Sequence, residues 1–237
     1  MNIFLKQVFI GLPKTVGNKE ATIPMEREWT SAIFKEPVQG SVWMGKTGLA
    51  GDGQWDLNHH GGPEKAVFAY GFENYSYWQK ELGITELTSG AMGENLVMDP
   101  TTEDTISIGD TFQIGGAVIQ VSQPRQPCWK PARRFKVKNL ALLLQTTGRT
   151  GWYFRVLQEG GVEEGQTFTL VDRPSPQWTI QKCNQVIHAK PQDFDEIREL
   201  SQCELLAPSM RATLAKRVSL KETPDIRSRV FGPNELE

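Results

Sequence analysis

The sequence is poor in cysteine and has no long apolar run. Among its 237 residues only Cys128, Cys183 and Cys203 carry thiols, an odd number without regular spacing, which argues against a disulfide framework. No apolar stretch approaches the roughly 18 residues that span a bilayer. The opening MNIFLKQVFIGLPK is too short and too polar for a secretion signal. We therefore expect a cytoplasmic protein that does not associate with membranes.

Several common signatures are also missing. The sequence contains no Walker-type phosphate loop, no Rossmann glycine fingerprint and no serine-hydrolase elbow. Three cysteines are too few for an iron–sulfur cluster held by this chain. These absences argue against a chain that carries its own nicotinamide, flavin or iron–sulfur redox centre.

Acidic residues are absent between Asp110 and Glu159. A local positive field of this kind usually indicates an anionic ligand. The alternative is that some of the cations pair with acids from elsewhere in the fold. This alternative applies best to Lys136 and Lys138. Eight cations occupy this window: Arg125, Lys130, Arg133, Arg134, Lys136, Lys138, Arg149 and Arg155.

One thiol lies in the middle of this cationic window. Cys128 occurs in the stretch VSQPRQPCWKPARRF, between two prolines and close to Arg125, Lys130, Arg133 and Arg134. Neighbouring cations favour the thiolate form, which is both a nucleophile and a soft metal ligand. A half-buried cysteine without a role is the alternative. Cys183 and Cys203 fall at or next to apolar helical positions, where we expect them to pack.

The first three-quarters of the chain reads mainly as strands. The 22 glycines and 14 prolines punctuate many short apolar segments, a pattern typical of a barrel or sandwich. We predict strands at residues 3–11, 38–45 and 66–70, two strands around a turn at Gly109-Asp110, and a strand, a glycine turn and another strand within residues 151–171. Helices are predicted at 72–82, ended by Gly83, and in the later half of 132–147, ended by Gly148.

A proline-marked linker, DRPSPQW at residues 172–178, separates this part from a helical one. Beyond it, apolar residues recur at helical spacing, and Ser209 is a candidate N-cap of the last helix. We predict a mainly β body with some α at residues 1–174 and a three-helix domain at 175–237. The apolar positions are Ile180, Cys183 and Ile187, then Phe194, Ile197 and Leu200, then Met210, Leu214 and Val218.

Two loop motifs are weak signals by themselves. His59 and His60 precede Gly61-Gly62-Pro63, and no further ligand stands at zinc spacing, so contact with an anion or hydrogen bonding is the better reading. The glycines let backbone amides approach a ligand closely. GENL at residues 93–96 indicates a turn.

The last helices carry six cations against few acids. They form a candidate nucleic-acid face, but we do not expect nucleic acid to bind, because a solvated helix face or a protein-docking surface explains the same charges. The cations are Arg211, Lys216, Arg217, Lys221, Arg227 and Arg229.

Taken in order, HHGGPEKAVFAY, GENL, SIGDTFQIGGAVIQVSQPRQPCWK and TGRTGWYFRVLQEGGV resemble the MOSC family, related to the C-terminal domain of molybdenum cofactor sulfurase. The likeness is greatest to its YiiM-type members and covers nearly the whole chain. It implies a β-barrel followed by a small three-helix domain. One departure is Gly165-Gln166, where the family often has Gly-Asp.

The resemblance implies that the molybdenum cofactor (molybdopterin) binds and that Cys128 is both the protein ligand of molybdenum and the catalytic residue. A soft thiolate suits such a metal. Cofactor-binding residues implied in the same way are Arg125, His60, Lys65, Glu94, Asn95 and Arg149, with Arg133 and Arg134 as second choices near the phosphate. Pyridoxal phosphate is not expected.

The implied activity is reduction of N-hydroxylated compounds, such as hydroxylaminopurine-type base analogues, as a detoxification. Electrons would have to come from a partner reductase, for which the basic C-terminal helices are a candidate docking face. The alternative is a carrier that holds sulfur as a Cys128 persulfide, or that stores or delivers the cofactor.

Overall fold

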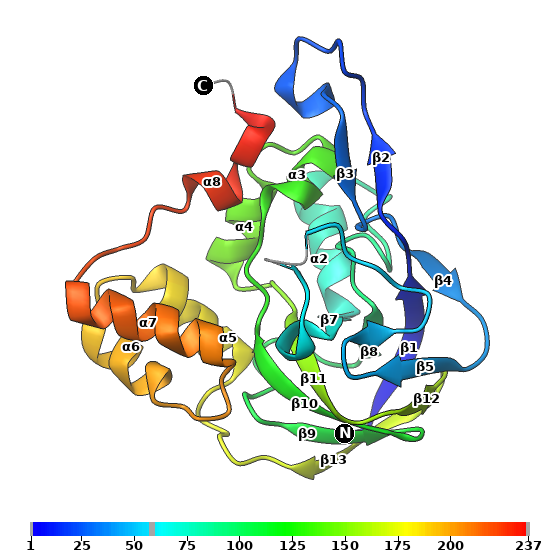
Figure 1. The fold of residues 1–237 in the computed structure, drawn as a ribbon, viewed down its shortest axis with the longest axis vertical. Helices are drawn as coiled ribbons and strands as arrows, with labels where there is room; N and C mark the ends of the chain where they lie inside the picture. Colours follow the sequence, from blue (N-terminus) through cyan, green and yellow to red (C-terminus); the bar gives the residue numbers. More distant parts are fainter. Residues whose placement is uncertain (1, 57–59, 236–237) are drawn as a thin grey trace.

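A computed structural model describes residues 2–56 and 60–235 of the chain. Its body is an eight-stranded sheet in the order β13-β9-β10-β11-β7-β8-β1-β4, in which β13 also pairs with β1 and so closes the sheet into a barrel (Figure 1). The strands are β1 (Ile3–Ile10), β4 (Glu36–Val38), β7 (Val67–Gly71), β8 (Leu96–Asp99), β9 (Thr111–Ile114), β10 (Ala117–Pro124), β11 (Trp152–Gln158) and β13 (Thr167–Asp172).

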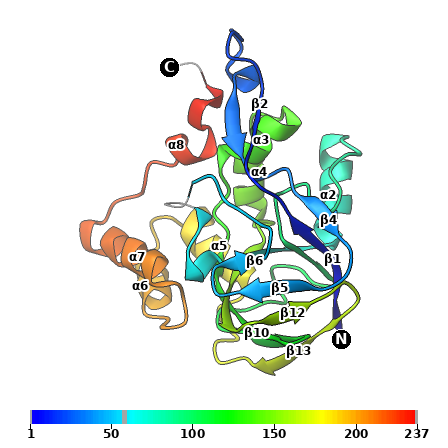
Figure 2. The ribbon, with the colours of Figure 1, turned by 45° about the vertical axis from the view of Figure 1, so that its right-hand side comes forward.

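The barrel is filled by the inward faces of these strands. Leu5, Met44, Phe112, Ile119 and Phe154 are among its fully or almost fully buried side chains. Two small sheets flank it: β12 (Gly160–Val162), β5 (Val42–Gly45) and β6 (Gly48–Leu49) form one, and the hairpin of β2 (Lys14–Val16) and β3 (Trp29–Ser31) forms the other. Figure 2 shows that hairpin extending beyond the barrel. The predicted β-barrel is confirmed.

One predicted turn is wrong. The two strands expected around Gly109-Asp110 both follow it, since β9 starts at Thr111 and the β9–β10 turn is Gly115-Gly116. Gly109 and Gly115 both have positive φ, so glycine alone could not choose between them. Asp110 is instead buried and accepts two hydrogen bonds from Arg173.

Three helices cover one side and one end of the barrel. α2 (Glu73–Leu82) ends at Gly83 and α4 (Leu140–Thr147) ends at Gly148, both glycines in the left-handed conformation, as predicted from the glycine stops. α3 (Trp129–Phe135) directly follows Cys128 and was not predicted. Short 3-10 turns lie at η1 (Pro24–Glu26) and η2 (Pro63–Lys65).

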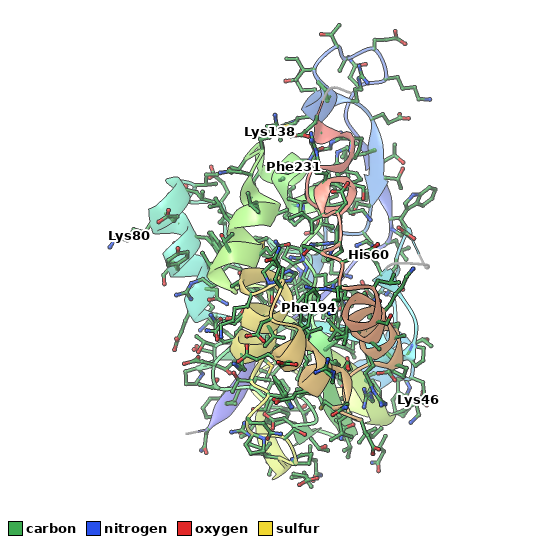
Figure 3. The ribbon with its side chains drawn as sticks, turned by 90° about the vertical axis from the view of Figure 1, so that its left-hand side faces the viewer. Lys46, His60, Lys80, Lys138, Phe194 and Phe231 are labelled. Atoms are coloured by element: carbon green, nitrogen blue, oxygen red, sulfur yellow. The ribbon has the colours of Figure 1, made fainter. Side chains whose placement is uncertain are left out.

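The C-terminal helices pack on the barrel through one continuous apolar core. α5 (Ile180–Asn184), the π-helical turn η3 (Gln185–Ala189), α6 (Phe194–Ser201) and α7 (Pro208–Leu220) contribute Ile180, Cys183 and Leu214 to the cluster that also holds Ile106 and Ile108. Figure 3 faces these helices, with Phe194 of α6 among them. The predicted helical domain is confirmed, and its boundary near residue 175 stays a prediction.

The Ser209 cap is wrong, because α7 begins at Pro208 with Ala207 as its N-cap. Proline suits the first helical position, where its missing N–H would have no intrahelical partner. Ser209 therefore lies inside the first turn.

The chain does not end with the third helix. After residue 221 it returns to the barrel, where α8 (Arg227–Val230) and η4 (Gly232–Asn234) lie beside α3 (Figure 1). Asn234 Nδ2 donates to the carbonyl of Trp129, and Arg133 donates to Asn234 Oδ1 and to the carbonyls of Pro233 and Pro24. The C-terminal tail, residues 225–235, thereby lies next to Cys128.

In the described part of the chain, no helix has the length and apolarity required to cross a bilayer.

Candidate functional site

Cys128 lies between two adjoining hollows. The inner recess, of about 80 Å³, reaches from the Ser31–Ile33 segment to Arg125, and the outer cleft, of about 830 Å³, reaches from Thr30 to the C-terminal tail. The outer cleft falls within the range of small-molecule sites. Six residues line both hollows: Trp55, His60, Lys65, Cys128, Lys130 and Tyr153.

The Cys128 sulfur is placed by the end of strand β10. That strand stops at Pro124, and Cys128 follows in an extended conformation immediately before α3. Its side chain is 8% exposed, and its Sγ lies 3.6 Å from His60 Nε2. All three thiols of the chain are free. Cys183 is fully buried, and burial raises the pKa of its thiol, so it packs as predicted.

His60 provides a neutral ring next to the sulfur. Burial, followed by the charges of Lys130 and Arg125, lowers the pKa of His60 to about 3, although Asp56 opposes the shift. The imidazole is therefore uncharged at neutral pH and offers one donor and one acceptor. The neighbouring His59 lies outside the described residues.

Arg125 brings a buried cation to the inner recess. Its side chain is 6% exposed, and its guanidinium carbon lies 5.1 Å from the centre of the Phe68 ring. Within residues 2–56 and 60–235, its buried Nη1 has no hydrogen-bond partner. A buried guanidinium donor without a partner is costly, so the recess is suited to an anionic group that would accept from it.

Further positive charge comes from three different segments. Lys65 ends η2, Lys130 lies in the first turn of α3, and Arg229 comes from α8. Arg229 donates to the carbonyl of Pro127 and to Gln145 Oε1. Two cations expected beside the thiol lie elsewhere, since Arg133 binds the C-terminal tail and Arg134 binds backbone carbonyls.

Glu94 does not line either hollow. It is fully buried and accepts from the Tyr75 hydroxyl and from the backbone amides of Gly90 and Met92. Arg134 donates to the carbonyls of Gly90, Ala91 and Ile33 at 2.7–3.1 Å. The two side chains thus hold the 90–93 turn, whose Met92 and Gly93 form part of the recess wall. The predicted contact of Glu94 with the cleft is corrected to a supporting role.

Arg149 is also directed away from the cleft. It donates to Asn74 Oδ1 at 2.6 Å and lies 4.1 Å from the Tyr77 ring. Asn74 in turn donates to the buried Glu103, so Arg149 belongs to a structural network under α2.

Asn95 does reach the inner recess, but its amide is already occupied. Its Oδ1 accepts from the Phe68 amide at 3.1 Å, and its Nδ2 donates to Asp52 Oδ2 at 2.8 Å and to the carbonyl of Phe9. The structure therefore brings His60, Lys65, Asn95, Arg125 and Cys128 together and leaves out Glu94 and Arg149.

The six C-terminal cations do not form one face. Arg217 is buried and donates to the carbonyls of Ile187 and Pro191, while Arg229 points to the cleft. Lys216, Lys221 and Arg227 remain exposed. The candidate docking face is accordingly smaller than the sequence indicated.

Sequence reasoning missed Gln123, Tyr153 and Arg229 as site residues. Tyr153 lies opposite Gln123 in the β10–β11 ladder, and burial raises its pKa to about 12, so its hydroxyl stays protonated. The motifs quoted for the resemblance contained Gln123 and Tyr153, but no motif contained Arg229. Which of these side chains reach the cleft depends on strand pairing and on the returning tail.

Comparisons with known proteins agree with this geometry. Residues 56–169 match the family model of the MOSC domain, and residues 178–220 match that of the YiiM-like 3-alpha helix domain. The uncharacterized protein YflK of Bacillus subtilis (strain 168) is 40% identical over 79% of this chain and 84% of that protein. Protein YiiM of Escherichia coli (strain K12) is 37% identical over 85% of this chain and 91% of that protein.

The chain belongs to the MOSC family and is of the YiiM type. The crystal structure of YiiM from Escherichia coli superposes on this YiiM-type chain with a TM-score of 0.80, 30% identity and coverage of 98% of this chain and 100% of that one. A protein named "Reductase" from Gibberella moniliformis (strain M3125 / FGSC 7600) is 36% identical over 74% of this chain. This YiiM-type chain spans only 32% of that longer relative.

The site fits the molybdenum cofactor associated with MOSC domains in three respects. Cys128 supplies one soft donor, Arg125 supplies a buried cation whose Nη1 has no partner among the described residues, and the cleft is large enough for a heterocycle. In the described part of the chain, His, Cys, Asp and Glu side chains form no cluster that would hold a metal by themselves. A metal held mainly by an organic ligand, with one thiolate from the protein, matches this donor set.

Proposed function

We propose that this MOSC protein is a molybdenum-cofactor-dependent reductase that converts N-hydroxylated compounds to the corresponding amines. The observation that supports it is the free Cys128 thiol at the junction of a recess and a cleft, next to the neutral His60 imidazole. The same recess holds Arg125, whose buried Nη1 has no hydrogen-bond partner among the described residues. The reaction adds two electrons and two protons to R–NHOH and yields R–NH2 and water.

In this proposal Cys128 holds the molybdenum through its thiolate, and Arg125 binds an anionic group of the cofactor in the inner recess. The bound cofactor supplies the two-electron chemistry that removes oxygen from the substrate. His60 Nε2, at 3.6 Å, donates to the sulfur and so stabilises its negative charge. Lys130 and Arg229, which both line the outer cleft, add positive potential there.

Lys65 is the proposed source of a proton. Burial lowers the pKa of its ammonium group, against the opposing charge of Asp56, so it releases a proton more readily than an exposed lysine. It lines both hollows and can face cofactor and substrate alike. Electrons would come from a separate reductase, and we propose the exposed cations Lys216, Lys221 and Arg227 as its docking contacts, with binding that weakens as salt rises.

The decisive experiment measures bound molybdenum and pterin in protein purified from a molybdenum-replete host. Wild type should carry both, and Cys128→Ser should carry much less. Cys203→Ser is the matched control, since Cys203 is half-buried and lines neither hollow. Wild type without cofactor, or a Cys128→Ser variant with as much as wild type, would overturn the proposal.

The carrier alternative makes different demands. A persulfide carrier should show sulfane sulfur on Cys128 and no turnover of N-hydroxylated compounds. Transfer would also require a partner thiol to reach a sulfur whose residue is only 8% exposed. That burial favours the reductase, in which small molecules enter the cleft and the sulfur stays in place.

A further inference from the structure

Gln123 has a buried side-chain oxygen that makes no hydrogen bond within the described part of the chain. It is 3% exposed, and among residues 2–56 and 60–235 its Oε1 has nothing to accept from. The same side chain lines the outer cleft. Buried amides are almost always hydrogen-bonded, so an oxygen without a partner among the described residues, in a side chain that lines the cleft, is suited to accept from a bound molecule.

A β-bulge explains how Gln123 reaches the cleft. In the ladder with β11, Val121 pairs with Phe154 and Gln123 pairs with Tyr153. β10 therefore has one extra residue at this point, between two residues that are consecutive partners on β11. Regular alternation would keep Gln123 on the side of Ile119 and Val121, which lie in the barrel core. Bulges often redirect side chains at functional sites, and here the break places an amide two residues before Arg125.

The surroundings indicate what this amide recognises. The outer cleft has three aromatic side chains, Trp55, Trp129 and Tyr153, of which Trp55 is 63% exposed at the rim. A neutral amide presents an acceptor and donors side by side, which matches an amino group next to a ring nitrogen. Aromatic faces beside such an amide suit a flat ring. The cation suited to an anion, Arg125, lines the inner recess instead.

We propose that Gln123 is the specificity-determining residue of the outer cleft and that its amide binds the amino and ring-nitrogen edge of a flat N-hydroxylated heterocycle. This inference rests on the proposed function, since it concerns the substrate of the same site. Its Oε1 accepts from the exocyclic N–H, and its Nε2 donates to the adjacent ring nitrogen. In this proposal Gln123 does not bind the metal.

The test compares two N-hydroxylated probes that differ in this edge. 6-Hydroxylaminopurine has the ring nitrogens, and N-phenylhydroxylamine is flat but lacks them. The dissociation constant of each is measured by quenching of tryptophan fluorescence, with and without bound cofactor. Gln123→Met keeps the side-chain volume and removes the hydrogen bonds, and Gln113→Met makes the same change at an exposed position on β9.

Gln123→Met should raise the Kd of 6-hydroxylaminopurine about tenfold, equivalent to about 1.4 kcal/mol. It should raise that of N-phenylhydroxylamine by a smaller factor, because this probe keeps the exocyclic N–H but has no ring nitrogen to accept from Nε2. Molybdenum content should stay at the wild-type value. Equal effects on both probes, no effect on either, or lost molybdenum with unchanged purine binding would overturn the inference. A wild type without molybdenum would end the proposed function, whereas the titration of cofactor-free protein would still decide the role of Gln123.

Discussion

Arg229 donates a hydrogen bond to the carbonyl oxygen of Pro127, the residue before Cys128, across 102 positions of sequence. Its second Nη donates to Gln145 Oε1 at 2.7 Å. One side chain of the C-terminal tail therefore joins the thiol-bearing segment to α4. Residues 225–235 lie outside the stretch that matches the YiiM-like 3-alpha helix domain, and two of them, Ser228 and Arg229, line the outer cleft.

We expect Arg229→Gln to loosen the Cys128 segment. Losing two charge-assisted hydrogen bonds should lower the free energy of unfolding by about 2 kcal/mol and increase the rate at which iodoacetamide labels Cys128. Urea titration and timed labelling measure the two effects. Arg227→Gln is the control, since Arg227 is exposed and pairs with Glu235 at the surface. Equal labelling of both variants would contradict the bracing role of Arg229.

Arg125→Met should separate stability from binding. Removing a buried cation whose Nη1 has no partner in residues 2–56 and 60–235 should leave the stability of the cofactor-free protein unchanged or raise it by up to about 1 kcal/mol. Molybdenum and pterin content should fall. Arg155→Met provides the contrast, because Arg155 pairs with Glu64 at 2.6 Å and also binds Gln120 and Leu205, so that variant should melt earlier. A large loss of stability in Arg125→Met would refute this assignment.

Glu94→Gln should lower the stability of the fold and leave cofactor binding nearly unchanged. The carboxylate accepts three hydrogen bonds, and an amide cannot accept all of them, so we expect a loss of about 1–3 kcal/mol in unfolding free energy. Molybdenum per folded molecule should change little. Glu86→Gln, at an exposed position, should change neither quantity. Reduced molybdenum at full stability would mean that Glu94 contacts the ligand after all.

His188 should make the protein sensitive to acid. Burial, with Arg229 and Arg217 nearby, lowers its pKa to about 3, against about 6.5 in the unfolded chain. Its contribution to stability is complete above pH 6.5. As the pH falls from 6.5 towards 3, only the unfolded state gains the proton, so stability falls by up to about 1.4 kcal/mol per pH unit.

The measurement is the unfolding free energy of wild type and His188→Gln between pH 7 and pH 4. The unfolding free energy of the variant should fall less steeply with decreasing pH than that of wild type. The difference in slope should be up to about 1.4 kcal/mol per pH unit, the value for one proton. Identical slopes would show that His188 does not titrate differently on unfolding.

The sequence alone predicted those parts of this protein whose structure is determined by residues close together in the chain. An apolar segment closed by Gly11 predicted β1, the Gly83 and Gly148 stops predicted the ends of α2 and α4, and the stretch around Cys128 indicated both the family and the central thiol. These features depend on strand and helix periodicity and on the left-handed conformation of glycine, which a few residues determine.

Only the tertiary structure decided which charged and polar groups face the thiol. Arg134 and Glu94 stand close to Cys128 or in a family motif, yet they hold a turn, whereas Gln123 reaches the cleft through a bulge and Arg229 through the returning tail. The direction of a side chain depends on strand register and on contacts between distant segments, and neither is set by the residues next to it.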